Sequence, residues 1–147
     1  MRRFAIPALA VLICIVSLCC TTYTTGLKQS VARADETAAI GAMHTIALAQ
    51  RSYSMSNNNE YGTFQQLCEA GYLDSRFNSS NPQIKNYVLT MTVNAKSEGA
   101  PEGFFSCNAD PAGSGAQGRH LYMDSTSTEV HVNPNQPATA QDPIFQP

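Results

Sequence analysis

Cysteines are the residues of this chain whose type and spacing could most readily support chemistry. Three of the five, Cys14, Cys19 and Cys20, lie in an apolar N-terminal run, while Cys68 and Cys107 lie in the remainder of the chain. If that remainder is exported to an oxidising compartment, its two cysteines most simply form one disulfide. Such a bridge would close a loop of about forty residues and contribute about 3–4 kcal/mol if unstrained. The alternative is two separate buried thiols.

The three histidines, His44, His120 and His131, show no metal-binding or catalytic spacing. His120 and His131 could lie on paired strands, but no H-x-x-x-H or C-x-x-C pattern accompanies them. We therefore expect exposed strand positions for these two and a surface or edge position for His44. A catalytic thiol needs a base such as histidine close to it in space. Cys68 has no histidine near it in the sequence, so the sequence does not identify such a base. The sequence thus predicts no enzyme and no cofactor or metal site.

A glycine-rich run, "GSGAQG" (113–118), matches the pattern G-x-G-x-x-G. Dinucleotide binding by that motif requires a strand before it and a helix N-terminus after it, where the pyrophosphate lies. Here a strand-like segment, "RHLYMD" (119–124), follows instead. The run therefore predicts a hairpin turn.

The N-terminus has the layout of a secretory signal or a retained signal-anchor. Arg2 and Arg3 precede the uncharged apolar run "FAIPALAVLICIVSLCC" (4–20), which is near the lower length limit for spanning a bilayer. Because basic residues stay on the cytoplasmic side, the rest of the chain should be exported. Beyond residue 20, nine basic residues less these two arginines leave seven against eleven acidic ones, a formal charge of −4. This acidic balance gives no footprint for nucleic acid.

Three endings of this leader compete. Cys19 or Cys20 could carry a lipid after cleavage, although "VSL" before Cys19 only half fits a lipobox. The run could instead be retained as a membrane anchor, an expectation that we rank equal to lipidation. Cleavage after "ARA" (32–34) ranks third, because it lies far beyond the apolar run. We treat residues 1–26 as signal peptide or signal-anchor and linker.

A long helix should follow, beginning near Leu27 or Ser30 and ending near Ser56, where "SNNNEYG" favours a turn. Apolar and small residues recur on one face at steps of three, four or seven, with Ala39, Met43 and Gln50 beside them. The members of this stripe are Val31, Ala38, Ala42, Ile46, Ala49 and Tyr53. A short second helix should begin at a T-x-x-Q capping box and end at Gly71.

The remainder predicts strands at "YVLTMTVN" (87–94), "FFSCNA" (104–109), "RHLYMD" (119–124) and "EVHV" (129–132). Their short connections imply an antiparallel meander. The Pro-rich segment 134–147 is expected to be a disordered tail. The fold class is therefore α+β: one domain over residues 27–133, with the long helix packed on a sheet of three to four strands.

Two stretches of the chain resemble type IV pilins and pseudopilins. The first, "ARADETAAIGAMHTIALAQRSYSMSNNNEYGTFQQLCEAGYLDSRF" (32–77), is similar to a family helix "R-A-x-E-A-x-A-x-x-x-x-R-T-I-N-T-A-Q-x-x-Y" followed by "Y-G-x-x-x-x-L-x-x-x-G-x-L-D". The second, "HLYMDSTSTEVHVN" (120–133), is similar to the family's closing hairpin. The residues matching the first pattern are Ala34, Glu36, Ala38, Thr45, Ile46, Ala49, Gln50, Tyr53, Tyr61, Gly62, Leu67, Gly71, Leu73 and Asp74.

The chain lacks the family's prepilin peptidase motif, a Gly-Phe start with a nearby Glu and an apolar segment continuous with the helix. Gly26-Leu27 is the nearest Gly-apolar pair, and Val31 stands where the Glu would be. The resemblance still implies a pilin-like fold and a structural or accessory role beside a type IV pilus or type II secretion system.

The expected protein is therefore exported, periplasmic or at the cell surface, and attached to the inner or outer membrane through its N-terminus. Its expected partners are other pilin-like or secretion-system subunits, including further copies of itself. Ala38, Ala42 and Ala49 are candidates for helix packing against another subunit, with packing under the chain's own sheet as the favoured alternative. The rival hypotheses are a free-standing exported binding module, such as a lipoprotein that captures a ligand, and a small exported enzyme.

Overall fold

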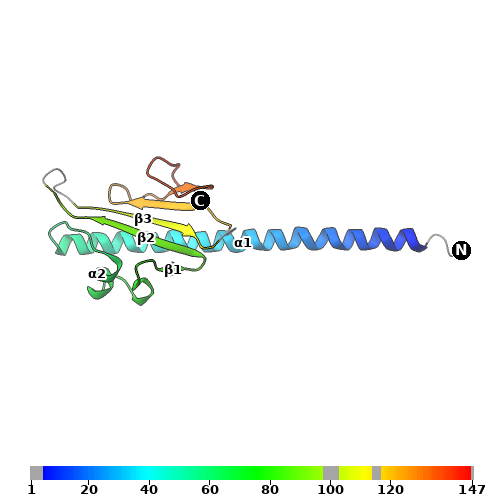
Figure 1. The fold of residues 1–147 in the computed structure, drawn as a ribbon, viewed down its shortest axis with the longest axis horizontal. Coiled ribbons are helices and arrows are strands. Elements are labelled where there is room, and N and C mark those ends of the chain that lie inside the picture. The colour runs from blue at the N-terminus through cyan, green and yellow to red at the C-terminus, as the bar shows by residue number, and fades with distance from the viewer. Residues whose placement is uncertain (1–4, 98–102, 114–116, 147) are drawn as a thin grey trace.

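The computed structural model describes residues 5–97, 103–113 and 117–146, with side chains from residue 26 onward. One long helix precedes two short helices and an antiparallel sheet (Figure 1). The elements are α1 (Ala5–Ser56), α2 (Phe64–Glu69), the 3-10 helix η1 (Ser75–Phe77), β1 (Gln83–Ile84), β2 (Tyr87–Asn94), β3 (Phe104–Pro111), β4 (His120–Asp124) and β5 (His131–Asn133). The fold is α+β, as the sequence predicts.

Helix α1 is continuous over 52 residues, about 78 Å at 1.5 Å per residue. Its C-terminal part lies along the sheet, and its N-terminal part projects beyond the head as a rod (Figure 1). The predicted start near Leu27 or Ser30 and the linker before it were therefore wrong. Threonines 21, 22, 24 and 25 cost a helix only a few tenths of a kcal/mol each, too little to end it between two helical segments.

The described residues form a five-stranded sheet with the strands in chain order, each pairing antiparallel with the next. Strand β2 has the predicted bounds, and β3 and β4 differ from prediction by one or two residues. The predicted count of three to four strands was too low, because Gln83–Ile84 pairs with the start of β2. That segment lies in a polar stretch whose composition indicates only a loop.

One face of the sheet packs on α1 and holds the core. Across β2, β3 and β4, Met91 pairs with Cys107 and Cys107 with Met123, all on this inner face. The buried helix positions run through the predicted stripe and its neighbours. They are Glu36, Ala39, Ala42, Met43, Ile46, Ala47, Ala49 and Gln50. Val31, predicted to be in the stripe, is 52% exposed, because it precedes Glu36, the first buried residue of α1 among the side chains that the structure describes.

Helix α2 begins and ends as its sequence predicts. Thr63 accepts a hydrogen bond from the Gln66 amide, and the Gln66 side chain accepts one from the Thr63 amide, which completes the capping box. Gly71 follows the helix with φ of +76°, a conformation that favours glycine.

The tail is ordered over residues 134–146, so the prediction of a disordered segment was wrong. Phe145 donates its amide hydrogen to Val130, and Val132 donates to Pro143. Ala138 is 2% exposed and accepts a hydrogen bond from Asn108. Prolines remove hydrogen-bond donors and favour extended backbone. The segment still docks, because side chains and the edge of β5 form hydrogen bonds with its remaining backbone groups.

The apolar run 4–20, with Cys14, Cys19 and Cys20, lies outside the residues whose side chains are described. Within the described part of the chain, no helix is both long enough and apolar enough to cross a membrane. Residues 114–116 of the glycine-rich run also lie outside it. The described ends of that run, Gly113 and Gly118, lie between β3 and β4, and the antiparallel pairing of these two strands agrees with the predicted hairpin.

Candidate functional site

The place where α1 meets the sheet, which we call the joint, is held by an ion pair between Glu36 on α1 and Arg119, the residue just before β4. The Arg119 Nη2 lies 2.5 Å from Oε1 of Glu36, and Nε lies 3.2 Å from both carboxylate oxygens. The Glu36 side chain is only 11% exposed and that of Arg119 40%. Hydrogen bonding to the Glu36 carboxylate raises the pKa of Arg119 above its usual range, so the guanidinium stays charged.

Tyr87 adds a second tie at the same place. Its hydroxyl donates to the backbone carbonyl of Arg119 at 3.0 Å, and burial, together with the nearby Glu36 charge, raises the pKa of Tyr87 to about 12. Gly118 has φ of +150°, and a Cβ there would lie 2.4 Å from the Tyr87 hydroxyl. Glycine is therefore needed next to Arg119 for the tyrosine to reach its carbonyl.

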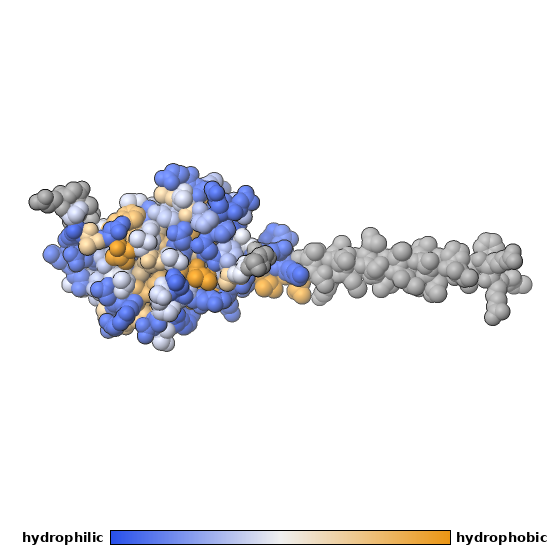
Figure 2. Space-filling model, in the orientation of Figure 1, coloured by the Kyte–Doolittle hydropathy of each residue, from blue (hydrophilic) through white to orange (hydrophobic). Residues whose placement is uncertain are grey.

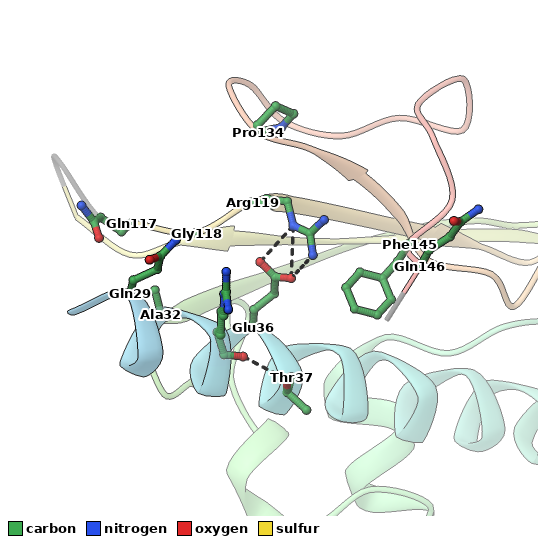
Figure 3. Close-up of a pocket in the computed structure, with 11 residues that line it drawn as sticks. Gln29, Ala32, Glu36, Thr37, Gln117, Gly118, Arg119, Pro134, Phe145 and Gln146 are labelled. Carbon is green, nitrogen blue, oxygen red and sulfur yellow. Dashed lines mark hydrogen bonds and ion pairs between the residues drawn. The ribbon is translucent and has the colours of Figure 1, made fainter. Parts of the chain in front are cut away.

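An open cleft of about 970 Å³ lies beside this ion pair. Figure 3 shows Glu36 and Arg119 pointing toward each other across it, with Phe145 alongside. The Arg119 guanidinium lies 5.0 Å from the centre of the Phe145 ring, a cation–π arrangement. The remaining lining is polar or small: Gln29, Ala32, Arg33, Thr37, Gln117, Gly118, Pro134 and Gln146. We call these residues, with Glu36, Arg119 and Phe145, the joint cleft.

Apolar side chains are exposed just where α1 leaves the head. Leu27 is 57% exposed and Val31 52%. Figure 2 shows apolar atoms at this position, while polar atoms cover most of the head on the face in view. The helix therefore presents apolar surface to its surroundings at the base of the rod.

Both cysteines outside the leader are free thiols, so the structure does not contain the predicted Cys68–Cys107 disulfide. Cys107 is buried in the middle of the sheet, and burial raises its pKa to about 12. Cys68 lies on α2, which packs on α1 and η1, and its thiol donates to the Asp74 carbonyl at 3.3 Å. The alternative of two separate thiols is the one observed, although Cys68 is only half-buried.

Of the three histidines, His44 lies at the surface as expected, whereas His120 and His131 are less exposed than predicted, because Asp110 lies against the first and the tail against the second. His44 is exposed on α1, while His120 and His131 are half-buried on the outer face of the sheet. The His120 Nδ1 lies 2.5 Å from Oδ1 of Asp110, and the two residues join β4 to β3. In the described part of the chain, no hydroxyl or thiol is hydrogen-bonded to His120, and no three His, Cys, Asp or Glu residues group as metal ligands.

The three alanines proposed for helix packing lie against the chain's own fold. Ala42 and Ala49 are 9% and 5% exposed and belong to the core, which is the favoured alternative. Ala38 is half-buried and lines a second, smaller groove with Gly41 and Phe77.

The ion pair at the joint was missed by the sequence analysis. Its two members are separated by 83 positions, and nothing in either local pattern identifies the partner. One signal was present: Glu36 is three residues before Ala39 and seven before Met43, so it falls on the buried stripe. A charged side chain at such a position needs an opposite charge close by.

Comparison with protein-family models, with curated proteins and with solved structures finds no match to this chain.

Proposed function

We propose that this protein is an exported, membrane-tethered structural or accessory subunit of the pilin-like kind, acting beside a type IV pilus or type II secretion system. The observation that carries the proposal is helix α1, which continues without a break from the apolar run into the core of the head. This continuity removes one of the two departures from the pilin pattern noted in the sequence. The missing prepilin peptidase motif is the departure that remains.

The joint suits a subunit whose head keeps a fixed orientation relative to its rod. Glu36 lies on α1 near the point where the N-terminal rod leaves the head, and Arg119 holds it to the sheet through two nitrogens. A bidentate pair fixes orientation as well as distance. A force or displacement applied to the rod is then transmitted to the sheet.

The apolar run 4–20 is the proposed tether, either retained in the membrane or replaced by a lipid on Cys19 or Cys20. The proposed partners are other pilin-like subunits, further copies of this chain included, that pack along the rod. Exposed Leu27 and Val31 offer apolar side chains for such packing at the base of the rod. The proposal includes no enzymatic reaction.

A second candidate function, an exported binding module, is favoured by the joint cleft. The lining of the cleft holds two arginines, Arg33 and Arg119, and one carboxylate, Glu36, so it carries a formal positive charge in a chain that is acidic beyond its leader. A small carboxylate or an acidic peptide end would fit that charge. Loss of binding on Arg33→Gln, with assembly intact, would identify this role.

In vivo photo-crosslinking tests the assembly proposal. A photo-reactive amino acid at Leu27 or Val31 should capture a pilin-like or secretion-system subunit in the source cells. The same probe at Gln65, exposed on α2 away from the rod, is the matched control. Equal products from both positions, or only unrelated proteins, would contradict the proposal.

A further inference from the structure

The outer edge of β5 is covered by the chain's own tail, residues 134–146. Val132 donates its amide hydrogen to the Pro143 carbonyl at 2.8 Å, and Phe145 donates to the Val130 carbonyl at 2.6 Å. These two bonds run in opposite directions and enclose one antiparallel bridge. The tail thus supplies a sixth, very short strand segment to the sheet.

The central pair of this bridge is His131 and Ile144. Because the hydrogen bonds are made by the residues on either side, Ile144 belongs to a pair that is not hydrogen-bonded, and its backbone N–H points away from β5. The pairing also stops at Pro143, which has no N–H to donate.

The loop that brings the tail back to this edge is organised by Asp142. Its carboxylate accepts hydrogen bonds from the Thr139 amide at 2.7 Å, the Thr139 hydroxyl at 2.9 Å and the Asn133 side chain at 2.7 Å. These bonds, the Thr139 amide first, lower the pKa of Asp142. The His131 Nδ1 lies 2.6 Å from the Asp142 carbonyl. The loop is therefore closed by hydrogen bonds among its own residues and tied to β5 through Asn133 and His131.

The end of the tail is held by its side chain as well as its backbone. Phe145 is half-buried against the core and lies beneath the Arg119 guanidinium. Ile144, on the other side of the segment, is 45% exposed. One face of the segment is thus bound by the head while the other faces water.

An uncovered edge strand presents unpaired N–H and C=O groups that can pair with an extended segment of another chain. Strand β5 spans only His131–Asn133, and both Val130 and Val132 are buried, so an incoming strand would find an apolar rim beside free backbone groups. In the isolated chain the tail already pairs with these backbone groups, so they are not available to another chain.

We propose that residues 134–146 guard the β5 edge, and that without this guard the edge accepts the same segment from a second copy of the chain. The site is defined by the backbone of residues 130–132 and the Arg119 guanidinium, and its ligand is an extended Pro-apolar-aromatic segment. The proposal does not depend on where helix α1 is anchored.

The test uses the full chain in detergent, a variant ending at Asn133, and a fluorescent peptide of residues 134–147. The truncated variant should bind the peptide, while the intact chain, whose edge is filled, should bind it at least about tenfold more weakly. Fluorescence anisotropy gives both affinities. A folded truncated variant that binds no peptide would overturn the proposal.

Two modified peptides separate strand pairing from simple apolar contact. N-methylation at Phe145 removes the hydrogen donated to Val130 and should weaken binding about tenfold or more, the scale of one lost hydrogen bond with a steric clash. N-methylation at Ile144, whose N–H points away from β5, is the matched control and should change binding by less than about threefold. Equal losses from both peptides would contradict strand pairing.

If the truncated variant does not fold, Asp142→Ala in the full chain decides the question. This change removes the three hydrogen bonds that hold the return loop and should open the edge to the peptide. Peptide binding above that of the intact chain supports the guard, and binding no stronger than that of the intact chain overturns it.

Discussion

Individual charges in this protein differ in how much water reaches them, and this decides what each ion pair contributes. Glu36 and Arg119 have side chains 11% and 40% exposed, whereas the pair Asp74 and Arg76 has 53% and 69%. Exposed pairs contribute about 0–1 kcal/mol, while removal of one partner of a shielded pair costs more, because the other is left unpaired.

We predict that Glu36→Gln lowers the free energy of unfolding by about 1–3 kcal/mol, with the half-exposed Arg119 limiting the loss. The matched control Arg76→Gln should cost clearly less than Glu36→Gln, because both members of the Arg76–Asp74 pair are already in water. Urea denaturation of each variant measures the difference. Equal costs would show that the joint is not held by this pair.

The contact between Gly118 and Tyr87 allows a double-mutant cycle. Gly118→Ala should cost about 2–3 kcal/mol, since its Cβ would displace the Tyr87 hydroxyl from the Arg119 carbonyl and its φ of +150° disfavours a side chain. In a Tyr87→Phe background, where the hydroxyl is absent, the same change should cost about 1 kcal/mol less. Additive costs from thermal unfolding would contradict a direct clash.

At the level of secondary-structure elements, α1 is tied to the segment that follows it by a buried side chain. Gln50 is fully buried, donates from Nε2 to the Gly62 carbonyl at 2.6 Å and accepts at Oε1 from the Gly62 amide at 3.0 Å. The side chain thus replaces a backbone partner for both groups of Gly62, which lets the turn fold back on the helix.

We predict that Gln50→Leu lowers stability by about 2–4 kcal/mol, because it leaves two buried backbone groups without partners. Gln65→Leu is the control: Gln65 is exposed on α2 and bonds only Glu69, so its loss should cost less than about 0.5 kcal/mol. Denaturant unfolding of both variants checks this. A stability for Gln50→Leu within error of the control would contradict the role given to Gln50.

The two thiols should differ sharply in reactivity. Cys68 is half-buried, whereas Cys107 is buried with its pKa raised to about 12, so an alkylating reagent should modify Cys68 at least about a hundredfold faster in the native state. Both should react equally after unfolding. Peptide mass spectrometry of non-reduced protein gives the rates, and a peptide linked through Cys68 and Cys107 would restore the disulfide expected from the sequence.

Local patterns predicted most of these elements but not how they meet. Alternation located β2, and the capping box and Gly71 located α2, because these signals reside within a few neighbouring residues. Strand β1 has only two residues, too few for a period, and the docking of the tail depends on partners far away in the sequence. The position of Glu36 on the buried stripe signalled the need for an opposite charge, but not which one, because Arg119 is charged and adjacent to a turn, as many surface residues are.

Seen as a whole, the molecule is a helical rod that emerges from a head in which the β5 edge of the sheet is covered by the tail. The same helix forms the core of the head and the proposed tether, so the position of the head relative to a membrane would be set by α1 alone. At 1.5 Å per residue, the end of the apolar run at residue 20 lies about 24 Å along the helix from Glu36. The proposed subunit would therefore hold its head clear of the lipid.

Fractionation of bacterial cells producing the full chain tests the proposed tethering most directly. We expect the protein to stay in the membrane pellet after alkaline carbonate extraction, with its head cut by protease added to spheroplasts. Replacing Leu12 and Val16 in the apolar run with lysine should release the protein or block its export. Wild-type protein found in the cytoplasm, protected from protease and free of membrane, would contradict the account.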